Sequence, residues 1–289
     1  NFFSLINGEF KQTINILDRG LSYGDGFFET MVWNSKVAEK KESFGVEFWK
    51  RHIRRIKKGC DAIKIEFPKK KIIEDYKKKI IRKALDSGLK KGILKIIITR
   101  GVGGRGYKFE KNMKPTIIFL LFPISPINKK YFSNGVNVKF CKTHLAKNPS
   151  ISGLKHLNRL DSVIASSEII NQDTFEGIFL DEELNLIEGT MTNIFFLKRG
   201  ILFTPPINDF GIDGIMRQVV IEKYLNFSEG IRIKKINFSH LNEFDGMFLT
   251  NSILKILPVK KIGKKIFKIP NSIFKITDYF EKSGNLEFT

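Results

Sequence analysis

The chain has 289 residues, 42% of them hydrophobic, and carries a net charge of +20 from 50 Lys and Arg residues against 30 Asp and Glu residues. This composition excludes a disordered chain, and the absence of any apolar run near ~20 residues excludes a transmembrane helix. The charge would suit a nucleic-acid-binding protein, but the lysines are scattered and no aromatic RNA-binding signature is present, so we favour a solvated surface that attracts anionic substrates, with no nucleic-acid partner.

The first half of the sequence predicts strands that alternate with two helices. Asn7-Gly8 is a typical type I′ turn, which predicts a hairpin near the N-terminus. Helical spacing of apolar residues and uninterrupted apolar runs mark the other elements. In chain order we expect a hairpin over 2–10, a glycine-punctuated loop over 18–26, a strand over 27–33, helices over 47–65 and 69–87, and strands over 93–99 and 116–122.

A glycine-rich loop, Arg100 to Pro115, joins the last two of these strands. Gly101, Gly103 and Gly106 have the G-x-G-x-x-G spacing of dinucleotide-binding turns. In those turns a helix begins at the third glycine, so that its N-terminus faces the pyrophosphate. Here Pro115 and a strand follow too soon for a helix to form. We therefore interpret the segment as a hairpin loop and reject the dinucleotide site.

The second half of the sequence predicts another mixed domain after a proline-containing linker. We expect a strand over 136–140, a helix over 157–171, three strands within 177–205, a helix over 214–225, strands over 247–258 and 261–269, and a closing helix over 272–282. The predicted class is α+β, with an N-terminal α/β domain over 1–122, a linker over 123–131, a C-terminal α/β domain over 132–289, and the active site in the interdomain cleft.

The cysteines and histidines give no sign of a metal or disulfide framework. Cys60 and Cys141 are far apart in the sequence, and the four histidines form no close ligand pair. The N-terminus lacks the basic-then-apolar pattern of a signal peptide. We expect a cytoplasmic protein with no bound metal and no membrane segment.

Four ordered segments carry the functional signal. They are DRGLSYGDGFFET at 18–30, GLKHLNRLDSV at 153–163, IEGTMTNIFF at 187–196 and GIDGIMR at 211–217. Together they resemble the class IV pyridoxal-phosphate enzymes, relatives of branched-chain and D-amino-acid aminotransferases, across nearly the whole chain. The resemblance implies the two-domain fold-type IV architecture of D-amino-acid aminotransferase, pyridoxal 5′-phosphate as the cofactor, a small-molecule substrate, and a homodimer.

Lys155 is the expected catalytic residue. It lies where an irregular loop is expected to become a helix, and the positive end of a helix dipole would favour the neutral, nucleophilic amine. An ordinary solvated lysine is the alternative interpretation of that position alone. The resemblance implies that Lys155 forms the covalent Schiff base with the cofactor and so belongs to the C-terminal domain.

Two further residues match the family's cofactor contacts. Glu188 would pair with the protonated pyridine nitrogen and keep the ring an electron sink. Arg55, in RHIRRI, would bind the cofactor phosphate with two parallel hydrogen bonds. An exposed turn carboxylate and one more cation on a basic helix are the alternatives, and neighbouring Arg54 leaves the register of the match open.

The remaining expected cofactor contacts rest on position in the family pattern. Backbone N–H groups at Ile215 and Met216 would face the phosphate at the start of a helix. Asn251 and Ser252 would complete the phosphate site. These four residues are assigned through the resemblance rather than from their chemistry.

The glycine loop and Phe28 are the expected substrate contacts. In related enzymes the equivalent loop reaches over the active site, so Arg105 would bind a substrate carboxylate and Tyr107 would form a wall or hydrogen-bond partner. The glycines would allow the backbone to turn tightly near a ligand. An uncommitted flexible hairpin loop is the alternative.

Details of the motifs favour one branch of the family. Phe28 stands where D-amino-acid aminotransferases have a tyrosine, and Met216 replaces a threonine of the transaminase-like GITR. The runs KHLNRL, GGRGY and N-x5-LPV resemble the aminodeoxychorismate lyases, whereas Glu29 resembles the aminotransferases. We expect a carbon–oxygen lyase that forms 4-aminobenzoate and pyruvate. A class IV aminotransferase acting on branched-chain or D-amino acids and a basic nucleic-acid-binding protein remain as alternatives.

Overall fold

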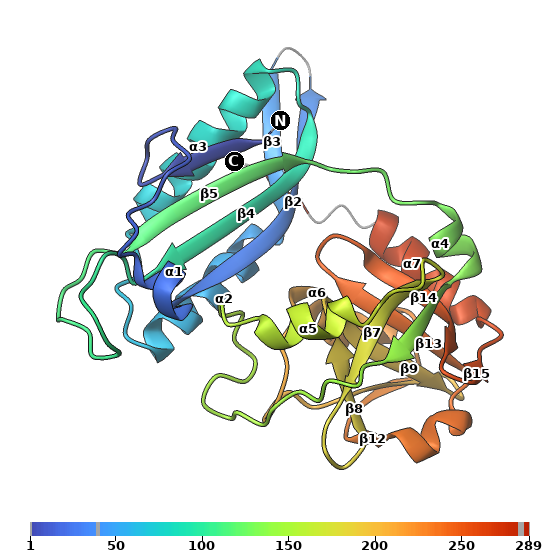
Figure 1. The fold of residues 1–289 in the computed structure, drawn as a ribbon. Helices are drawn as coiled ribbons and strands as arrows, with labels where there is room; N and C mark the ends of the chain where they lie inside the picture. The colour runs from blue at the N-terminus through green and yellow to red at the C-terminus, as the bar shows by residue number, and fades with distance from the viewer. Residues whose placement is uncertain (1, 39–40, 283–285, 289) are drawn as a thin grey trace. The chain divides into compact units, whose positions relative to one another are not determined.

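The computed structural model describes residues 2–38, 41–282 and 286–288, and its contacts divide the chain into two compact units (Figure 1). The first unit comprises 1–125, 154–158 and 285–289, and the second comprises 126–153 and 159–284. The division near residue 125 lies within the predicted linker. The segment 154–158 differs from the prediction, because it leaves the C-terminal domain and joins the first unit.

The first unit is built on a six-stranded sheet in which every neighbouring pair is antiparallel. The strand order is β1-β5-β4-β2-β3-β16. The strands are β1 (Phe3–Ile6), β2 (Gly26–Ala38), β3 (Lys41–Glu47), β4 (Lys91–Thr99), β5 (Thr116–Pro123) and β16 (Leu286–Phe288). The predicted turn is confirmed at Asn7-Gly8, where both residues have positive φ and a bridge joins Ile6 to Glu9, while β1 pairs along its length with β5.

Helices α2 (Trp49–Ala62) and α3 (Lys70–Asp86) pack on this sheet, and a short helix, α1 (Arg19–Tyr23), precedes β2. Alternate side chains along the central strands face the two long helices and are fully buried, for example Met31, Trp33, Ile96 and Phe119. This period-two pattern against a helical stripe is the arrangement that the apolar spacing predicted. Both helices are confirmed, with ends a few residues inside the expected bounds.

The segment 154–158 joins the first unit because its backbone pairs with the start of β2. Phe28 donates its N–H to the carbonyl of Lys155 at 3.0 Å, and Leu157 donates to the carbonyl of Gly26 at 3.0 Å. The expected helix over 157–171 is correspondingly shorter, because α5 runs only over Leu160–Ser167. Lys155 therefore lies in an extended segment and not at a helix N-terminus, so the prediction based on the helix dipole was wrong.

The glycine loop joins β4 and β5, which are adjacent and antiparallel. No helix begins between Arg100 and Pro115, a stretch that the structure describes throughout. The predicted hairpin loop is therefore confirmed, and it presents no helix N-terminus of the kind that binds a pyrophosphate in dinucleotide-binding turns.

The second unit contains a ten-stranded sheet with helices on its surface. The strand order is β11-β10-β9-β13-β14-β6-β7-β8-β12, with β15 paired to β14. The strands are β6 (Val136–Phe140), β7 (Thr174–Leu180), β8 (Asn185–Gly189), β9 (Asn193–Lys198), β10 (Ile201–Thr204), β11 (Gly230–Ile233), β12 (Ile236–Asn237), β13 (Gly246–Asn251), β14 (Lys255–Ile262) and β15 (Lys265–Ile266). The helices are α4 (Lys130–Asn134), α5, α6 (Ile215–Lys223) and α7 (Asn271–Lys282), with 3-10 turns at Tyr224–Asn226 and Phe238–Glu243.

Four strands, rather than the three expected, lie between residues 174 and 204. The additional break between strands falls at Thr190–Thr192, between β8 and β9. The core beneath these strands is aromatic, with Phe195 and Phe248 stacked at 5.0 Å between ring centroids. Asn193 and Asn251 lie on the neighbouring strands β9 and β13, and Glu188 lies on β8, which pairs with β7 and β12.

Within residues 2–38, 41–282 and 286–288, no helix is long and apolar enough to cross a membrane. Among the same residues, no group of three or more His, Cys, Asp or Glu side chains is placed to bind a metal ion.

Gly101 tests whether the start of the glycine loop has a fixed backbone. Its φ is +93°, and a Cβ there would collide with the carbonyl oxygen of Lys114. Gly101→Ala should therefore lower the free energy of unfolding by at least about 1–2 kcal/mol, measured by denaturant titration. Gly104→Ala is the control, because no atom lies within 4 Å of its Cβ position. Equal stability of the two variants would contradict a fixed loop backbone.

Candidate active site

Lys155 is positioned by the strand pairing described above, on the side of β2 that carries Phe28. Its Nζ lies 4.4 Å from the centroid of the Phe28 ring. Lys95 of β4 faces the same ring, with Nζ at 5.1 Å from the centroid, and burial lowers the pKa of Lys95. Two amines therefore meet at one aromatic side chain and form a partly buried site in the first unit.

A buried charged cluster lies on the opposite face of β2, beneath α2. Arg55 donates from Nε and Nη2 to the two carboxylate oxygens of Glu29, each at 2.7 Å, and His52 Nδ1 lies 2.5 Å from the same carboxylate. All three side chains are at most 8% exposed. The family resemblance led us to expect a phosphate as the partner of the Arg55 guanidinium. In this structure its partner is the carboxylate of Glu29.

The charge state of this cluster follows from its partners. Burial by itself would raise the pKa of Glu29, but Arg55 and His52 lower it to about 2. Burial lowers the pKa of His52, and the charges of Arg55 and Lys155 add to this effect against the opposing effect of Glu29. At neutral pH the cluster therefore contains an ionised Glu29, a charged Arg55 and a neutral His52 that donates its Nδ1–H to Glu29.

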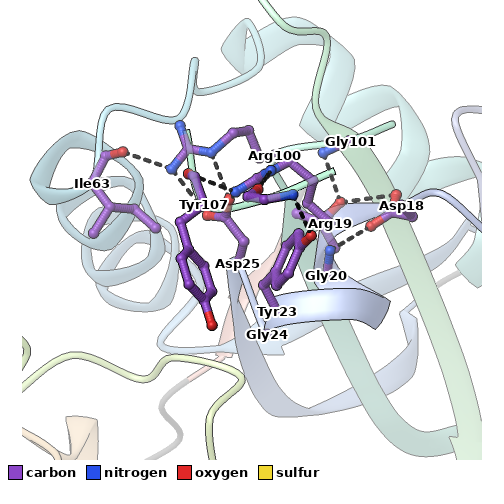
Figure 2. A network of polar contacts seen from close by, with 12 residues as sticks. Asp18, Arg19, Gly20, Tyr23, Gly24, Asp25, Ile63, Arg100, Gly101 and Tyr107 are labelled. Carbon is purple, nitrogen blue, oxygen red and sulfur yellow. Dashed lines mark hydrogen bonds and ion pairs between the residues drawn. The ribbon is translucent and has the colours of Figure 1, made fainter. Parts of the chain in front are cut away.

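A second network fixes the segment before β2 to the glycine loop (Figure 2). Asp25 accepts hydrogen bonds from Arg19 Nε at 2.9 Å and from Arg100 Nε and Nη2 at 2.7 and 2.9 Å. Burial would raise the pKa of Asp25, but the two guanidinium groups lower it. Arg100 also donates to the carbonyls of Ile63 and Lys64, at the end of the helix that carries His52 and Arg55.

Arg19 binds the backbone of the glycine loop directly. Its Nη1 and Nη2 donate to the carbonyls of Gly106 and Tyr107 at 2.8 and 3.1 Å, and the N–H of Gly106 donates to the Tyr23 hydroxyl at 2.8 Å. Tyr23 and Tyr107 pack edge to face, as Figure 2 shows. The tip of the loop is thus bound through its main chain. Tyr107 is nevertheless 86% exposed and Arg105 is also exposed.

Glu188 lies one residue before the end of β8 in the second unit, and its carboxylate is buried. Its Oε2 accepts hydrogen bonds from the N–H of Ile212 at 2.8 Å and from Asn193 Nδ2 at 3.3 Å. A Cβ at Gly211 would collide with the Glu188 carboxylate, so the 211–214 turn can lie this close to Glu188 only because residue 211 is glycine. The charge of Glu188 also acts on two partly or fully buried arginines, Arg159 and Arg217. Glu188 is therefore a fixed, buried carboxylate and not an exposed turn residue.

The start of α6 lies beside Glu188. Gly214 is the N-cap of this helix and provides no side-chain cap, so the first-turn N–H groups, those of Ile215 and Met216 included, are oriented for an external acceptor. A Cβ at Gly214 would collide with Asn193 Oδ1, which keeps this position small. The predicted helix start is confirmed, while its use by a phosphate stays a prediction.

Asn251 and Ser252 form the turn between β13 and β14. Asn251 Oδ1 accepts from the N–H groups of Ile253 and Leu254 at 2.9 and 2.8 Å, and its Nδ2 donates to the carbonyl of Met191 at 3.3 Å. The side chain therefore organises two turns. Lys255 donates to the carbonyl of Ser252 at 2.8 Å, and burial lowers the pKa of Lys255 to about 7.

Each unit gathers its own share of the predicted residues. Phe28, Arg55 and Lys155 belong to the first unit, and Glu188, Ile215, Met216, Asn251 and Ser252 belong to the second. The sequence patterns did not indicate His52, Lys95, Arg159 or the Arg19–Asp25–Arg100 network as parts of the site. A period-two reading of β2 would have placed Glu29 on the apolar inner face, where a charged residue requires a partner.

Comparison with known proteins gives the family of this chain. Residues 26–262 match the model of the class IV aminotransferases, and the chain belongs to this family. It is 29% identical to an aminodeoxychorismate lyase of Vibrio harveyi over 97% of this chain and 98% of that one. It is 26% identical to a D-alanine aminotransferase of Bacillus licheniformis, covering 89% and 87% of the two chains. The crystal structure of 4-amino-4-deoxychorismate lyase from Pseudomonas aeruginosa superposes with a TM-score of 0.87 at 27% identity, over 98% of this chain and 99% of that one.

Pyridoxal 5′-phosphate is the cofactor of this family and of this chain. The residues present fit such a group. A partly buried amine at an aromatic ring, a buried carboxylate held by two donors, and an uncapped helix N-terminus match an aldehyde, a pyridinium nitrogen and a phosphate in turn.

The buried pair of Glu29 and Arg55 makes a strong stability prediction. Glu29→Gln leaves the Arg55 charge buried without a carboxylate, which should cost about 3–5 kcal/mol of unfolding free energy at pH 7. Because the pKa of Glu29 falls from 4.5 to about 2 on folding, its contribution is present above pH 4.5 and is lost as pH falls through about 2. The gap between the parent and the variant should shrink over that range in denaturant titrations.

Asp61→Asn is the matched control for this experiment. It removes the exposed Lys57–Asp61 pair, whose side chains are 53% and 55% exposed. Its cost should stay within about 0.5 kcal/mol. A cost for Glu29→Gln as small as that of the control would show that the buried cluster does not stabilise the fold.

Proposed function

We propose that this chain is an aminodeoxychorismate lyase, which converts 4-amino-4-deoxychorismate to 4-aminobenzoate and pyruvate in folate biosynthesis. The observation that carries the proposal is the similarity to the V. harveyi lyase along nearly the full length of both chains. The motifs around Lys155, the glycine loop and Asn251 support the same branch of the family. A cytoplasmic homodimer is part of the proposal.

Lys155 has two roles in this proposal. Its amine would hold the cofactor through a covalent bond to the aldehyde carbon, and in its free form the amine would remove the proton from the substrate carbon that bears nitrogen. The bound cofactor would supply an electron sink for that step. The enolpyruvyl group would take up a proton in place of the one removed and leave as pyruvate, and the aromatic ring that results makes release of 4-aminobenzoate favourable.

The surrounding residues bind and orient the cofactor. Glu188 pairs with the pyridine nitrogen, and its hydrogen bonds from Ile212 and Asn193 fix the carboxylate in place. The N–H groups of Ile215 and Met216 bind the phosphate, with Asn251 and Ser252 shaping the neighbouring turn. Arg55 contributes positive charge toward the phosphate while its fork remains on Glu29.

The substrate carries carboxylates, and the first unit offers cations for them. Arg105 binds a substrate carboxylate through two parallel hydrogen bonds, and Tyr107 lines the same loop. Binding of the loop backbone by Arg19 limits the conformations open to both residues. Lys95 adds a cation beside Phe28, on the ring that Lys155 also faces.

Product stoichiometry separates this proposal from an aminotransferase, the function that the D-alanine aminotransferase relative supports. We expect the purified holoenzyme to form 4-aminobenzoate and pyruvate in equal amounts with no added 2-oxo acid, because lyase chemistry needs no amino acceptor. Pyruvate is measured with lactate dehydrogenase and 4-aminobenzoate by chromatography. A turnover that requires a 2-oxo acid would support the aminotransferase instead.

A further inference from the structure

Glu176 is a fully buried carboxylate with no role in the proposed reaction. It lies on β7 at 0% exposure. Its Oε1 accepts hydrogen bonds from the N–H of Met191 at 2.6 Å and from Thr190 Oγ1 at 3.3 Å, and its Oε2 contacts Thr192 Oγ1 at 2.9 Å. All three partners belong to the turn between β8 and β9, which directly follows Glu188 and Gly189.

The same turn is bound from a second direction. Met191 gives its N–H to Glu176, and its carbonyl accepts from Asn251 Nδ2 at 3.3 Å. One peptide segment thus connects Glu176 to the 251–254 turn. A Cβ at Gly189 would collide with both Glu176 and Thr192, so the carboxylate packs directly against the backbone that carries Glu188.

We propose that Glu176 is a positioning residue, which holds the Thr190–Thr192 turn and through it sets both Glu188 and the Asn251 turn for the cofactor. The inference rests on the proposed roles of Glu188 and Asn251. Glu176 itself does not touch the reacting atoms. Its effect passes through the backbone of Met191, because the N–H of this residue bonds to Glu176 and its carbonyl accepts from Asn251.

The electrostatics around Glu176 are consistent with this role. Burial raises the pKa of Glu176 to about 7, and the charge of Glu188 acts in the same direction, against the hydrogen bonds from the turn. A protonated Glu176 can donate to Thr192 Oγ1, and so can the amide of a glutamine. Glu176→Gln therefore retains the contacts that Glu176→Ala removes.

The test measures the turn and the cofactor separately. Hydrogen exchange of the Met191 amide, followed by mass spectrometry on the protein freed of cofactor, reports the turn. Titration of the same protein with pyridoxal 5′-phosphate reports the site. We expect Glu176→Ala to speed the exchange and raise the Kd of the cofactor by about 10-fold or more, the factor that corresponds to ~1.4 kcal/mol. Glu176→Gln should stay within about threefold of the parent for both.

Glu168→Ala is the matched control. Glu168 also accepts three hydrogen bonds from a different loop, from the N–H groups of Lys142 and Thr143 and from the Thr143 hydroxyl. It should leave the Met191 amide and the cofactor affinity unchanged. If Glu176→Ala fails to fold, Thr192→Val removes one partner and should still raise the cofactor Kd.

The outcomes separate this inference from the proposed function. A folded Glu176→Ala protein with the parent's exchange rate or the parent's cofactor Kd overturns the positioning role, as does a Thr192→Val protein with the parent's Kd. If the parent itself does not bind the cofactor, the proposed function fails. In that case the exchange rate of the Met191 amide alone decides whether Glu176 fixes the conformation of the Thr190–Thr192 turn.

Discussion

Two main-chain hydrogen bonds between residues 154–158 and the start of β2 fix the backbone position of Lys155, the candidate catalytic residue. They place the carbonyl of Lys155 on the N–H of Phe28, and the lysine amine over the Phe28 ring. Because Phe28 and Glu29 are neighbours on one strand, their side chains lie on opposite faces of the sheet. Lys155 therefore lies against one face of β2, beside Phe28, and the cluster of Glu29, Arg55 and His52 lies on the other face.

Several ion pairs around β2 are largely buried. Glu29 and Arg55, and Asp25 with Arg19 and Arg100, are all removed from water with bidentate or multiple hydrogen bonds. Ion pairs of this kind are weak sources of net stability, but they fix geometry, since any displaced partner would leave a buried charge. Arg19 extends this constraint to the glycine loop, which keeps its backbone in place while Arg105 and Tyr107 face solvent. The second unit uses hydrogen bonds from backbone N–H groups for the same purpose at Glu188 and Glu176.

Local patterns predicted most of the fold. Periodicity located α2, α3, β4 and β5, and the ordered motifs indicated the family, with Lys155 and Glu188 as candidate site residues. The extended segment at 154–158 could not be predicted, because its partners on β2 are distant in sequence and its own pattern suits a helix. The partnership of Glu29 with Arg55 was missed for a related reason, since a strand residue and a helix residue must be paired in three dimensions first. The residues around Glu176 in the sequence give no indication that its side chain binds the turn at Thr190–Thr192.

The central claim is that the amine held over Phe28 is the one that binds the cofactor. Reduction of the holoenzyme with borohydride, followed by proteolysis and mass spectrometry, tests it directly because reduction makes the imine bond permanent. The account predicts a pyridoxyl-phosphate adduct on Lys155 alone, and none in Lys155→Ala protein treated in the same way. Lys95 faces the same ring and is the most demanding alternative. An adduct on Lys95, or on any lysine other than Lys155, would contradict the account.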